Sequence, residues 1–400
     1  MSYIALYRKY RPKIFDEVHG QSAIVQTLKN QIKSNRIGHA YLFSGPRGTG
    51  KTSVSKIFAK TINCENPIDG NPCLQCECCK KFANDLNLDI IEIDAASNNG
   101  VDNIRSLIEE SKYMPQYGKY KVYIVDEVHM LSNSAFNALL KTLEEPTRNV
   151  VFILATTEEH KVPATIYSRC QHYQFKLINN DDIVNALKYI LVKESIKWDS
   201  DDSLLHLAKL AKGGLRDAIS LLDQCIIFSS GELTKELIME VFGEVDNTII
   251  ADIVNVISNK DICRLIDIVQ EQERNGKHLS RLCDDLYEYY RDEYFNLSNN
   301  TTKTIYERYM KILATLSEKM KYNNSRALFE IEMIKLCKPE METDYNSLNQ
   351  RIYDLEKTIG KLINGQIVTS TSNNQVNHNN DFINMYIHTL PKVSINIYNI

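Results

Sequence analysis

A glycine-rich segment near residue 50 has the residue types and spacing of a phosphate-binding loop. It matches the pattern G-x-x-x-x-G-K-[ST] without a mismatch, between a short apolar run and a segment of helical periodicity. The loop and the serine after it comprise Gly45, Pro46, Arg47, Gly48, Thr49, Gly50, Lys51, Thr52 and Ser53. Glycines let backbone N–H groups converge on phosphates, Lys51 can reach the outer phosphates, and the Thr52 hydroxyl can bind Mg²⁺. The loop therefore predicts a nucleotide site.

Two adjacent acidic residues, Asp126 and Glu127, end the third apolar run of the chain. Asp126 can hold Mg²⁺ through its water shell, and Glu127 can orient an attacking water and accept its proton. The fourth apolar run ends at Thr157. Its hydroxyl could bond the γ-phosphate or the water, although threonine also simply suits strands. Beside a phosphate loop, these are the residue types that nucleotide hydrolysis requires.

Five of the ten cysteines lie between residues 64 and 79, in a stretch with too few apolar residues to bury a core of its own. The set Cys64, Cys73, Cys76 and Cys79 has the spacing C-x8-C-x2-C-x2-C, and C-x2-C steps suit tetrahedral zinc. Cys78 is adjacent to Cys79, and spacing alone leaves open which of the two would close the site. Structural zinc is favoured over free thiols or a redox switch. The other five cysteines are expected to be packing residues, namely Cys170, Cys225, Cys263, Cys283 and Cys337.

The size and composition of the chain exclude several classes of protein. Four hundred residues suffice for two to three domains, and 43% hydrophobic with 24% charged residues is ordinary for a globular protein. A net charge of -4 argues against a polybasic coat but leaves room for local basic patches. There is no apolar region of the length that secretion needs, and the densest apolar run is too short for a membrane span. We therefore expect a cytoplasmic protein with reduced thiols and no membrane partner.

The elements that must position these residues alternate in type up to residue 178. Strands are predicted at residues 40–43, 88–94, 121–126 and 149–157, with segments of helical periodicity between them. Continuous apolar strands between helices indicate a parallel sheet covered on both faces. The ends of such strands face the ligand crevice, which is where the phosphate loop and the acidic pair fall.

Only helical periodicity is found after residue 178. It occurs in three segments over residues 179–242, and it continues to about residue 364. An apolar seam near the end of this region consists of Leu348, Ile352, Leu355, Ile359 and Leu362. The seam covers only about two heptads, so an ordinary amphipathic helix is favoured over a coiled coil. Residues 365–400 begin with the composition of a polar tail.

Together these motifs resemble the AAA+ clamp-loader ATPases, the family of the γ/τ subunits of bacterial DNA polymerase III. The resemblance extends over about residues 3–340. It rests on YRKYRPKIFDEVHGQ, GPRGTGKTS, the cysteine cluster, DEVHMLSNSAFNALLKTLEEP, ATTEEHKVPATIYSRCQ and GGLRDAISLLDQ. It implies an α/β AAA+ P-loop ATPase domain over residues 1–178 with a zinc-binding insertion at 64–79. A small helical lid domain at 179–242, an all-α oligomerisation collar at 243–364 and a flexible tail at 365–400 would follow.

The resemblance also implies roles for single residues. Arg169 matches the arginine of the SRC motif, which reaches into the ATP site of a neighbouring subunit. Arg216 matches the second sensor, which contacts the nucleotide from the lid, and Thr157 matches the first. The family carries zinc on the four cysteines that the spacing indicates. The segment expected to pack against the adenine contains Arg11, Pro12 and Val18.

A DNA contact is implied at a helix preceded by Asn98 and Asn99, with Arg105 on the helix. Helix N–H groups and one arginine can follow backbone phosphates without reading sequence, but an ordinary capped surface helix has the same pattern. The implied activity is ATP hydrolysis that loads a sliding clamp on primed DNA, with ATP, Mg²⁺ and Zn²⁺. The implied partners are the delta and delta-prime subunits, further copies of the chain, the beta clamp and primed DNA.

Rival interpretations share some of these features. A branch-migration motor would have the phosphate loop and the acidic pair, but not the four-cysteine insertion or the SRC motif in this form. A non-catalytic clamp-loader scaffold would have a broken phosphate loop. A zinc-dependent DNA-binding module would need no motor. The chain has no polymerase site of its own, so the resemblance implies only association with DNA polymerase, in the replisome.

Overall fold

The fold was obtained as a computed structural model that describes residues 3–83, 88–229, 231–243, 247–297, 299–322, 325–343 and 345–363. These residues fall into two compact units that divide between residues 246 and 247. The tail predicted at residues 365–400 lies outside the described residues. No described helix combines the length and the apolar character needed to cross a membrane.

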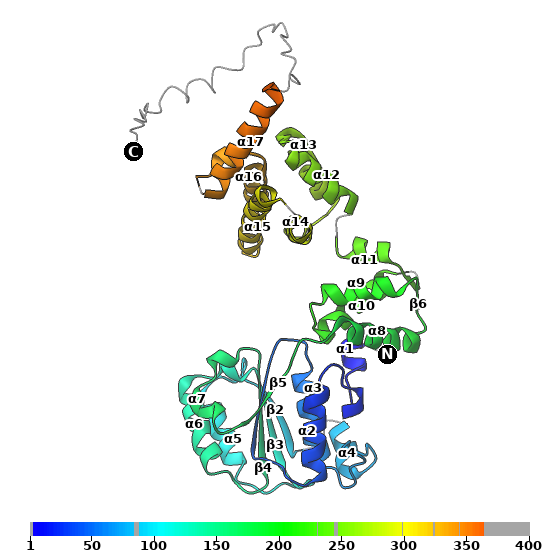
Figure 1. Ribbon diagram of the computed structural model, residues 1–400. Helices are drawn as coiled ribbons and strands as arrows, with labels where there is room; N and C mark the ends of the chain where they lie inside the picture. Colours follow the sequence, from blue (N-terminus) through cyan, green and yellow to red (C-terminus); the bar gives the residue numbers. More distant parts are fainter. Residues whose placement is uncertain are drawn as a thin grey trace, which may run out of the picture. The chain divides into compact units, whose positions relative to one another are not determined.

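A five-stranded parallel sheet forms the centre of the first unit (Figure 1). Its strands are β1 (Ala40–Ser44), β2 (Ile90–Asp94), β3 (Lys121–Asp126), β4 (Val150–Thr156) and β5 (Gln171–Gln174). They lie in the order β2-β3-β4-β1-β5. The predicted parallel sheet is confirmed, but β5 was not predicted. The edge strand β5 is short and reads QHYQ, without the apolar run that marks a buried strand.

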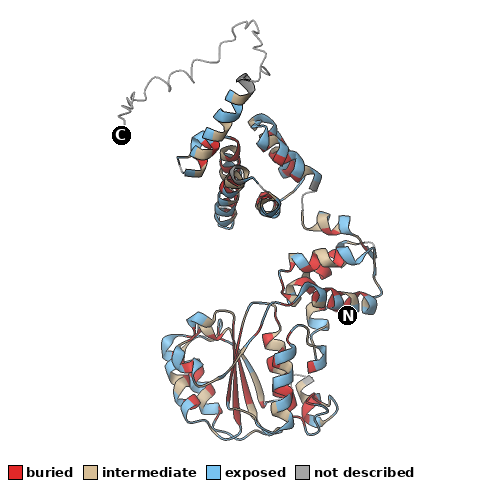
Figure 2. Ribbon diagram, in the orientation of Figure 1, coloured by how far each residue is buried: buried red, intermediate tan, exposed pale blue. Residues whose placement is uncertain are grey.

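Helices cover both faces of this sheet because alternate strand residues point to opposite sides. Tyr41 and Phe43 of β1 pack in one core with α2 (Ser22–Lys33) and α3 (Lys51–Ile62). Leu42 packs in the other core, with the helices of the opposite face. These are α5 (Val101–Glu110), α6 (Asn133–Glu144) and α7 (Ala164–Tyr167). Figure 2 shows the buried residues concentrated in the middle of the sheet, where β1 and β4 are buried at every residue, whereas β2 and β5 are only partly buried.

Five short elements complete the sheet-containing part of the first unit. They are α1 (Leu6–Lys9), η1 (Phe15–Glu17), α4 (Glu77–Ala83), η2 (Val128–Met130) and η3 (Glu159–Lys161). Helix α4 belongs to the cysteine-rich insertion, and η2 follows the acidic pair. Leu6 of α1 packs into the core of the helical region that follows the sheet, so the start of the chain joins the two parts of this unit.

The helical part of the first unit differs from the prediction of three helical segments. It contains α8 (Asn180–Glu194), β6 (Lys197–Trp198), α9 (Asp201–Leu210), α10 (Leu215–Phe228), β7 (Glu232–Leu233) and α11 (Lys235–Val241). There are thus four described helices, and β6 and β7 form a parallel two-stranded pair. Strands of two residues are too short to give a period-two pattern in a sequence.

The second unit is helical throughout its described residues. Its elements are α12 (Asn247–Ser258), α13 (Ile262–Arg274), α14 (Leu279–Asn296), α15 (Asn300–Met320), α16 (Arg326–Cys337), η4 (Pro339–Met341) and α17 (Tyr345–Ile363). Arg308 of α15 is buried and joins three of them, with Nε donating to Glu342 at 2.9 Å and Nη1 to Gln350 of α17 at 2.9 Å. It also donates to the backbone carbonyl of Lys335 in α16.

Helix α17 contains the predicted apolar seam, and the seam side chains that the structure describes are largely exposed. Its buried face carries Ser347 and Gln350, whereas Ile352, Leu355 and Ile359 are 54%, 63% and 53% exposed. The expected amphipathic helix is thus present, but its apolar face is not the face that packs on its own unit. Periodicity reveals that a helix has an apolar face, but not what that face contacts.

Candidate functional site

The glycine-rich loop connects the end of β1 to the start of α3, as its sequence predicts. Gly45 has φ +140°, and a Cβ there would lie 2.3 Å from the carbonyl oxygen of Phe175. Gly50 has φ +99° and precedes the first turn of α3. Both backbone conformations favour glycine, and the unpaired N–H groups of the helix start face the loop. Such a loop at a helix N-terminus attracts anions.

Lys51 is buried against this loop, with Nζ donating to the carbonyl oxygens of Gly45 at 2.8 Å and Pro46 at 2.9 Å. Burial lowers the pKa of Lys51, and the nearby charges of Glu127 and Asp126 act in the opposite direction. The ammonium group is therefore held at the loop by acceptors that a phosphate could replace.

The side chains predicted for metal binding and water activation come together at the carboxyl ends of β3 and β4. The Thr52 hydroxyl donates to Asp126 Oδ2 at 2.7 Å. Glu127 has φ +47°, a left-handed conformation between β3 and η2. Its Oε2 accepts from the Thr157 hydroxyl at 2.9 Å and from the Thr157 N–H at 3.3 Å. Thr157 thus contacts the candidate catalytic base directly.

His129 also contacts this group, and the sequence analysis did not identify it. Its ring is 6% exposed, with Nδ1 3.0 Å from Thr156 Oγ1 and 3.4 Å from Glu127 Oε2. Nε2 lies 3.3 Å from Glu158 Oε1. The only sequence signal was its position two residues after Glu127, in the middle of a three-residue element that is too short to predict.

The helical region reaches the phosphate loop through the first turn of α10. The Arg216 N–H donates to the Gly48 carbonyl at 3.4 Å, and its guanidinium lies 4.9 Å from the centre of the Tyr7 ring. The pKa of Tyr7 is lowered, first by its hydrogen bond from Arg8 and further by Arg216. Both contacts couple the loop to the helical region and to α1.

The N-terminal segment predicted to pack on the base lies beside α3. The Arg11 guanidinium donates to Ser53 Oγ at 3.2 Å. Val18 is half-buried and packs on the core that α2 and α3 share, and Pro12 is also half-buried. These contacts place the segment next to the start of the phosphate-loop helix.

Arg169 is not joined to the phosphate loop of its own chain. Its Nη2 donates to Glu144 Oε1 at 2.6 Å and its Nη1 to the Thr165 carbonyl at 2.8 Å. The Arg169 side chain lies beside the end of α6 and is 33% exposed. Glu144 is a partner that the sequence analysis did not identify.

Four sulfur atoms gather in the insertion that follows α3. The Sγ atoms of Cys64, Cys73, Cys76 and Cys79 all lie within 4.8 Å of one another. Sulfurs bound tetrahedrally at about 2.3 Å from zinc would be about 3.8 Å apart, so the group is close to the size required. Backbone N–H groups donate to the sulfurs, as that of Cys76 does to Cys73 at 3.3 Å. Cys78 is buried but is not a member of the group.

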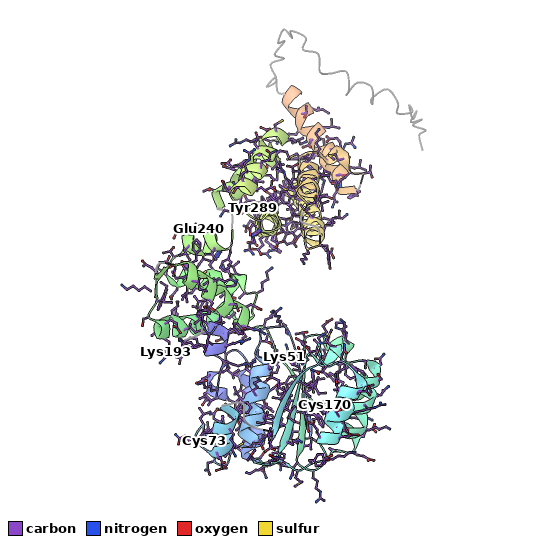
Figure 3. All side chains as sticks on the ribbon, turned by 180° about the vertical axis from the view of Figure 1, so that it is seen from behind. Lys51, Cys73, Cys170, Lys193, Glu240 and Tyr289 are labelled. Atoms are coloured by element: carbon purple, nitrogen blue, oxygen red, sulfur yellow. The ribbon has the colours of Figure 1, made fainter. Side chains whose placement is uncertain are left out.

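The cysteine group is separated from the phosphate loop by the length of α3. A helix of 12 residues rises about 18 Å, and Lys51 begins α3 while Cys64 follows its end. Figure 3 labels Lys51 and Cys73 at separate places on the domain. The insertion is fixed to the N-terminal segment by Asn71, which accepts from the Phe15 N–H at 2.9 Å and donates to Asp16 at 2.8 Å.

The remaining cysteines are mostly packing residues, as expected. Cys225, Cys283 and Cys337 are buried, and burial raises the pKa of the Cys225 and Cys283 thiols to about 12. Cys170 is half-buried and packs on the sheet core. Cys263 is exposed, so the expectation was wrong for that residue.

The predicted DNA residues lie around the start of α5. Asn98 donates to the Asp94 carbonyl at 3.1 Å, and the carbonyl of Asn99 accepts from the Ser132 N–H at 3.2 Å. Arg105 is exposed and pairs with Asp102 at 3.3 Å. Because α5 also ends in two glutamates, its only basic residue is outnumbered by carboxylates. The described part of α5 therefore has a helix start but no basic surface.

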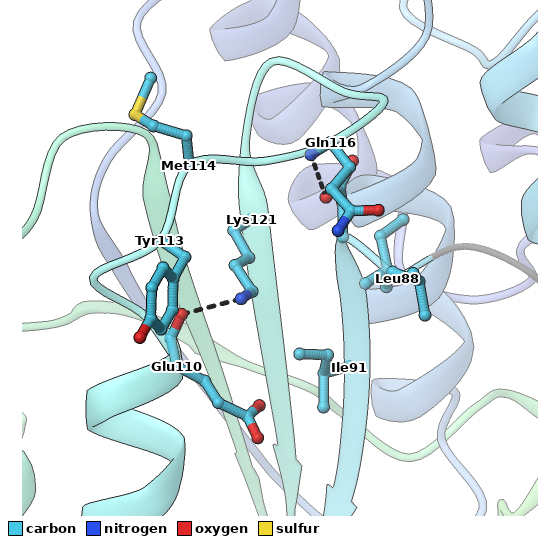
Figure 4. Close-up of a pocket in the computed structure, with 9 residues that line it drawn as sticks. Leu88, Ile91, Glu110, Tyr113, Met114, Gln116 and Lys121 are labelled. Atoms are coloured by element: carbon cyan, nitrogen blue, oxygen red, sulfur yellow. Dashed lines mark hydrogen bonds between the residues drawn. The ribbon is translucent and has the colours of Figure 1, made fainter.

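A surface groove beside β2 is separate from this site (Figure 4). Its walls are tied by hydrogen bonds from Lys121 Nζ to the Glu110 carbonyl at 2.8 Å and from the Gln116 N–H to Asp89 at 2.7 Å. Lys121 begins β3, whereas Asp126 ends it. The groove therefore lies at the opposite end of the strand from the candidate site.

The sheet, its phosphate loop and the acidic pair define a P-loop nucleotide-binding protein. Residues 20–179 match the family described as DNA polymerase III, delta subunit. Residues 182–231 match the ATPase lid domain of the DNA polymerase III clamp loader subunit. The solved RuvB branch-migration motor of Thermotoga maritima is 18% identical, with a TM-score of 0.45 over 64% of this chain and 80% of that one.

Two curated relatives identify the family. The DNA polymerase III subunit tau of Bacillus subtilis is 41% identical over 390 residues, which are 90% of this chain and 69% of the relative. Subunit tau of Escherichia coli is 45% identical over 243 residues, or 61% of this chain and 38% of the relative. The chain belongs to the gamma/tau family of DNA polymerase III subunits. It spans little more than a third of the Escherichia coli relative, and about two thirds of the Bacillus one.

Proposed function

We propose that the chain is an ATP-hydrolysing motor subunit of a bacterial clamp loader, which couples ATP turnover to placing a sliding clamp on primed DNA. The observation that carries this proposal is the joint placement of Lys51, Thr52, Asp126 and Glu127 at one end of the sheet in a member of this family. A non-catalytic scaffold is not favoured, since such a subunit would need none of these side chains in working positions.

Each side chain has a chemical role that its position supports. Lys51 would move from the loop carbonyls to the outer phosphates of ATP. Thr52 and Asp126 would hold Mg²⁺, which neutralises charge on the phosphates when it is bound. Glu127 would orient the attacking water and accept its proton, in an orientation fixed by Thr157. Arg216 would report nucleotide binding to the lid, since its backbone already bonds the loop.

Arg169 is proposed to act on the ATP of a neighbouring subunit. It is partly exposed and held by Glu144 rather than by its own phosphate loop, so it is available to a second chain. A guanidinium suits the charge that develops on a transferring phosphoryl group. Hydrolysis would then require aligned subunits. Copies of the chain, delta and delta-prime subunits and the beta clamp are the proposed partners, with the helices at 243–364 joining subunits.

Zinc is proposed to hold the insertion at residues 64–79. The four gathered sulfurs fit Zn²⁺ in number, type and spacing, and N–H donors to sulfur stabilise the thiolate form. Cys64, Cys73, Cys76 and Cys79 would bind it, with Cys78 left as a packing residue. Zinc would supply structure rather than catalysis, because the group follows the far end of α3 from Lys51.

Contact with DNA is proposed through backbone phosphates at the start of α5, where Asn98 and Asn99 lie. This arrangement would grip primed DNA without reading its sequence. The domain limits proposed are 1–178, 179–242 and 243–364, with a tail at 365–400. A role in the replisome would place the protein in the cytoplasm, associated with DNA polymerase but without polymerase activity of its own.

The proposal is tested by Lys51→Ala, with Lys56→Ala as a control on the same helix. The Lys56 ammonium pairs with Glu92 of β2, and none of the ion pairs described for it involves the phosphate loop. ATP turnover and loading of the clamp on primed DNA should both be lost in the first variant and kept in the second. If both activities survive Lys51→Ala, the motor function is excluded.

The role of Arg169 is tested by mixing two inactive variants. Arg169→Ala keeps a complete ATP site, and Lys51→Ala keeps the arginine. A mixture of the two should regain part of the ATPase activity if Arg169 acts between subunits. If the mixture stays as inactive as each variant alone, Arg169 does not act in this way.

A further inference from the structure

Helix α17 exposes an apolar stripe that its own unit does not cover. The stripe consists of Leu348, Ile352, Leu355 and Ile359, which are 44%, 54%, 63% and 53% exposed. Their spacing alternates steps of four and three residues, so they form one line along the helix. Contiguous exposed apolar surface of this kind marks a site of protein contact.

The opposite face of α17 is the one that packs on its unit, and it is polar. Gln350 accepts from the buried guanidinium of Arg308 at 2.9 Å and donates to Tyr309 at 3.3 Å, while Ser347 is fully buried. Helix α17 packs on α15 and η4 through this face. The helix is thereby fixed in rotation, with its apolar line turned outward.

We propose that this line pairs with α17 of a second copy of the chain, as a short parallel two-stranded coiled coil. In heptad terms Leu348 and Leu355 occupy d positions, and Ile352 and Ile359 occupy a positions. Branched Ile at a with Leu at d favours two parallel strands over three or four. The residue types therefore select the geometry as well as the apolar character of the partner.

The charges beside the seam support the same orientation. Arg351 is at a g position and Glu356 is at the e position of the next heptad, and both are exposed. Neither forms an ion pair with another described residue. In a parallel pair, Arg351 of each helix lies beside Glu356 of the other, giving two opposite-charge contacts. In an antiparallel pair g positions face g positions and e positions face e positions, so these contacts are lost.

A seam of about two heptads is weak by itself, since sustained coiled coils extend over three to four. The pairing is therefore expected to add to other contacts between subunits. The inference rests on the proposal that residues 243–364 join subunits, and it names the helix and the partner. It does not involve the nucleotide site, so association can be measured without ATP.

The test measures association of the full chain by sedimentation equilibrium. Leu355→Lys should weaken association by more than about tenfold, because a charge enters the apolar seam. Arg351→Glu should weaken it about threefold to tenfold, through two like-charge contacts in place of two opposite-charge ones. Combining Arg351→Glu with Glu356→Arg should restore it, since the pairs are then only reversed. Circular dichroism of each variant checks that the helices remain folded.

Orientation is tested by oxidative cross-linking of Leu355→Cys, with Lys357→Cys as a control at an exposed position on the side of the helix opposite the seam. Equivalent d positions face each other in a parallel pair, so the first variant should form a bond between two 355 side chains, identified by peptide mass. The control should not.

Unchanged association in Leu355→Lys, or equal cross-linking at both positions, would overturn the inference. Such results would mean that a different subunit, or residues 364–400 of the same chain, covers the seam. Lys51→Ala should associate normally. If the Lys51→Ala variant keeps its ATPase activity and still associates through the seam, the proposed function fails and this inference stands.

Discussion

The hydroxyl of Thr157 offers a way to measure how far catalysis depends on the orientation of Glu127. The two groups are 2.9 Å apart, and the Thr157 N–H adds a longer contact of 3.3 Å to the same oxygen. Thr157→Val removes the hydroxyl but keeps the shape and the backbone contact. We expect slower hydrolysis with little change in nucleotide affinity, because Glu127 would act on water and not on the bound phosphates.

The size of the effect follows from the geometry. A hydrogen bond to a charged group contributes about 1.5–3 kcal/mol when it is buried. The Glu127 side chain is 35% exposed, so water can replace part of the lost bond. A remaining loss of about 1–2 kcal/mol corresponds to a fall in kcat of about five- to thirtyfold. Thr157→Ser keeps the donor and should remain within about twofold of the parent rate.

The assay is steady-state ATP turnover at saturating ATP, in a cycle with Glu127→Gln. If Thr157 acts through Glu127, Thr157→Val should add little to the loss already caused by Glu127→Gln. Parent rates in Thr157→Val would refute the proposed positioning role. So would a full additional loss in the double variant, since Thr157 would then act independently of Glu127.

Three further predictions concern other contacts. Cys73→Ser should lose its zinc, measured by metal analysis, and should have a lower melting temperature. Cys78→Ser should keep its zinc. Equal zinc loss in both variants would contradict the assignment of ligands. Arg216→Ala should weaken ATP binding about tenfold in a fluorescent-nucleotide titration. The control Arg274→Ala, in the second unit, should leave the affinity unchanged. Equal affinities in the two variants would mean that Arg216 does not contribute to nucleotide binding. Arg308→Met should destabilise the second unit by about 3 kcal/mol in urea denaturation, because it removes one partner of a buried ion pair, and Arg291→Met, at an exposed pair, should cost less than about 1 kcal/mol. Equal losses of unfolding free energy in Arg308→Met and Arg291→Met would mean that the buried network around Arg308 contributes little to stability.

Local motifs allowed much of the nucleotide site to be predicted from the sequence. The phosphate loop and the acidic pair are continuous segments, and their chemistry restricts the residues that can occupy them. The parallel sheet was predictable because buried strands leave apolar runs. Strand β5 left no such run, and His129 left no signal, since its contacts with Thr156 and Glu158 come from other segments of the chain.

Tertiary contacts account for the features that the sequence did not predict. The pairing of Arg169 with Glu144 joins residues 25 apart in the chain and depends on how α6 and α7 pack. Spacing alone leaves open whether Cys78 or Cys79 closes the group, and the first turn of α4, which contains both, brings Cys79 to the other sulfurs. The orientation of α17 follows from the Arg308–Gln350 contact, which no periodicity can reveal.

The most direct test of the central claim is the rate of ATP hydrolysis by the full chain alone and with its proposed partners. The clamp, the delta and delta-prime subunits and primed DNA would be added singly and then together. We expect a low rate for the chain alone, a strong increase only with the complete set, and no increase when the chain carries Arg169→Ala. A rate that does not respond to the complete set, or that responds equally without Arg169, would contradict it.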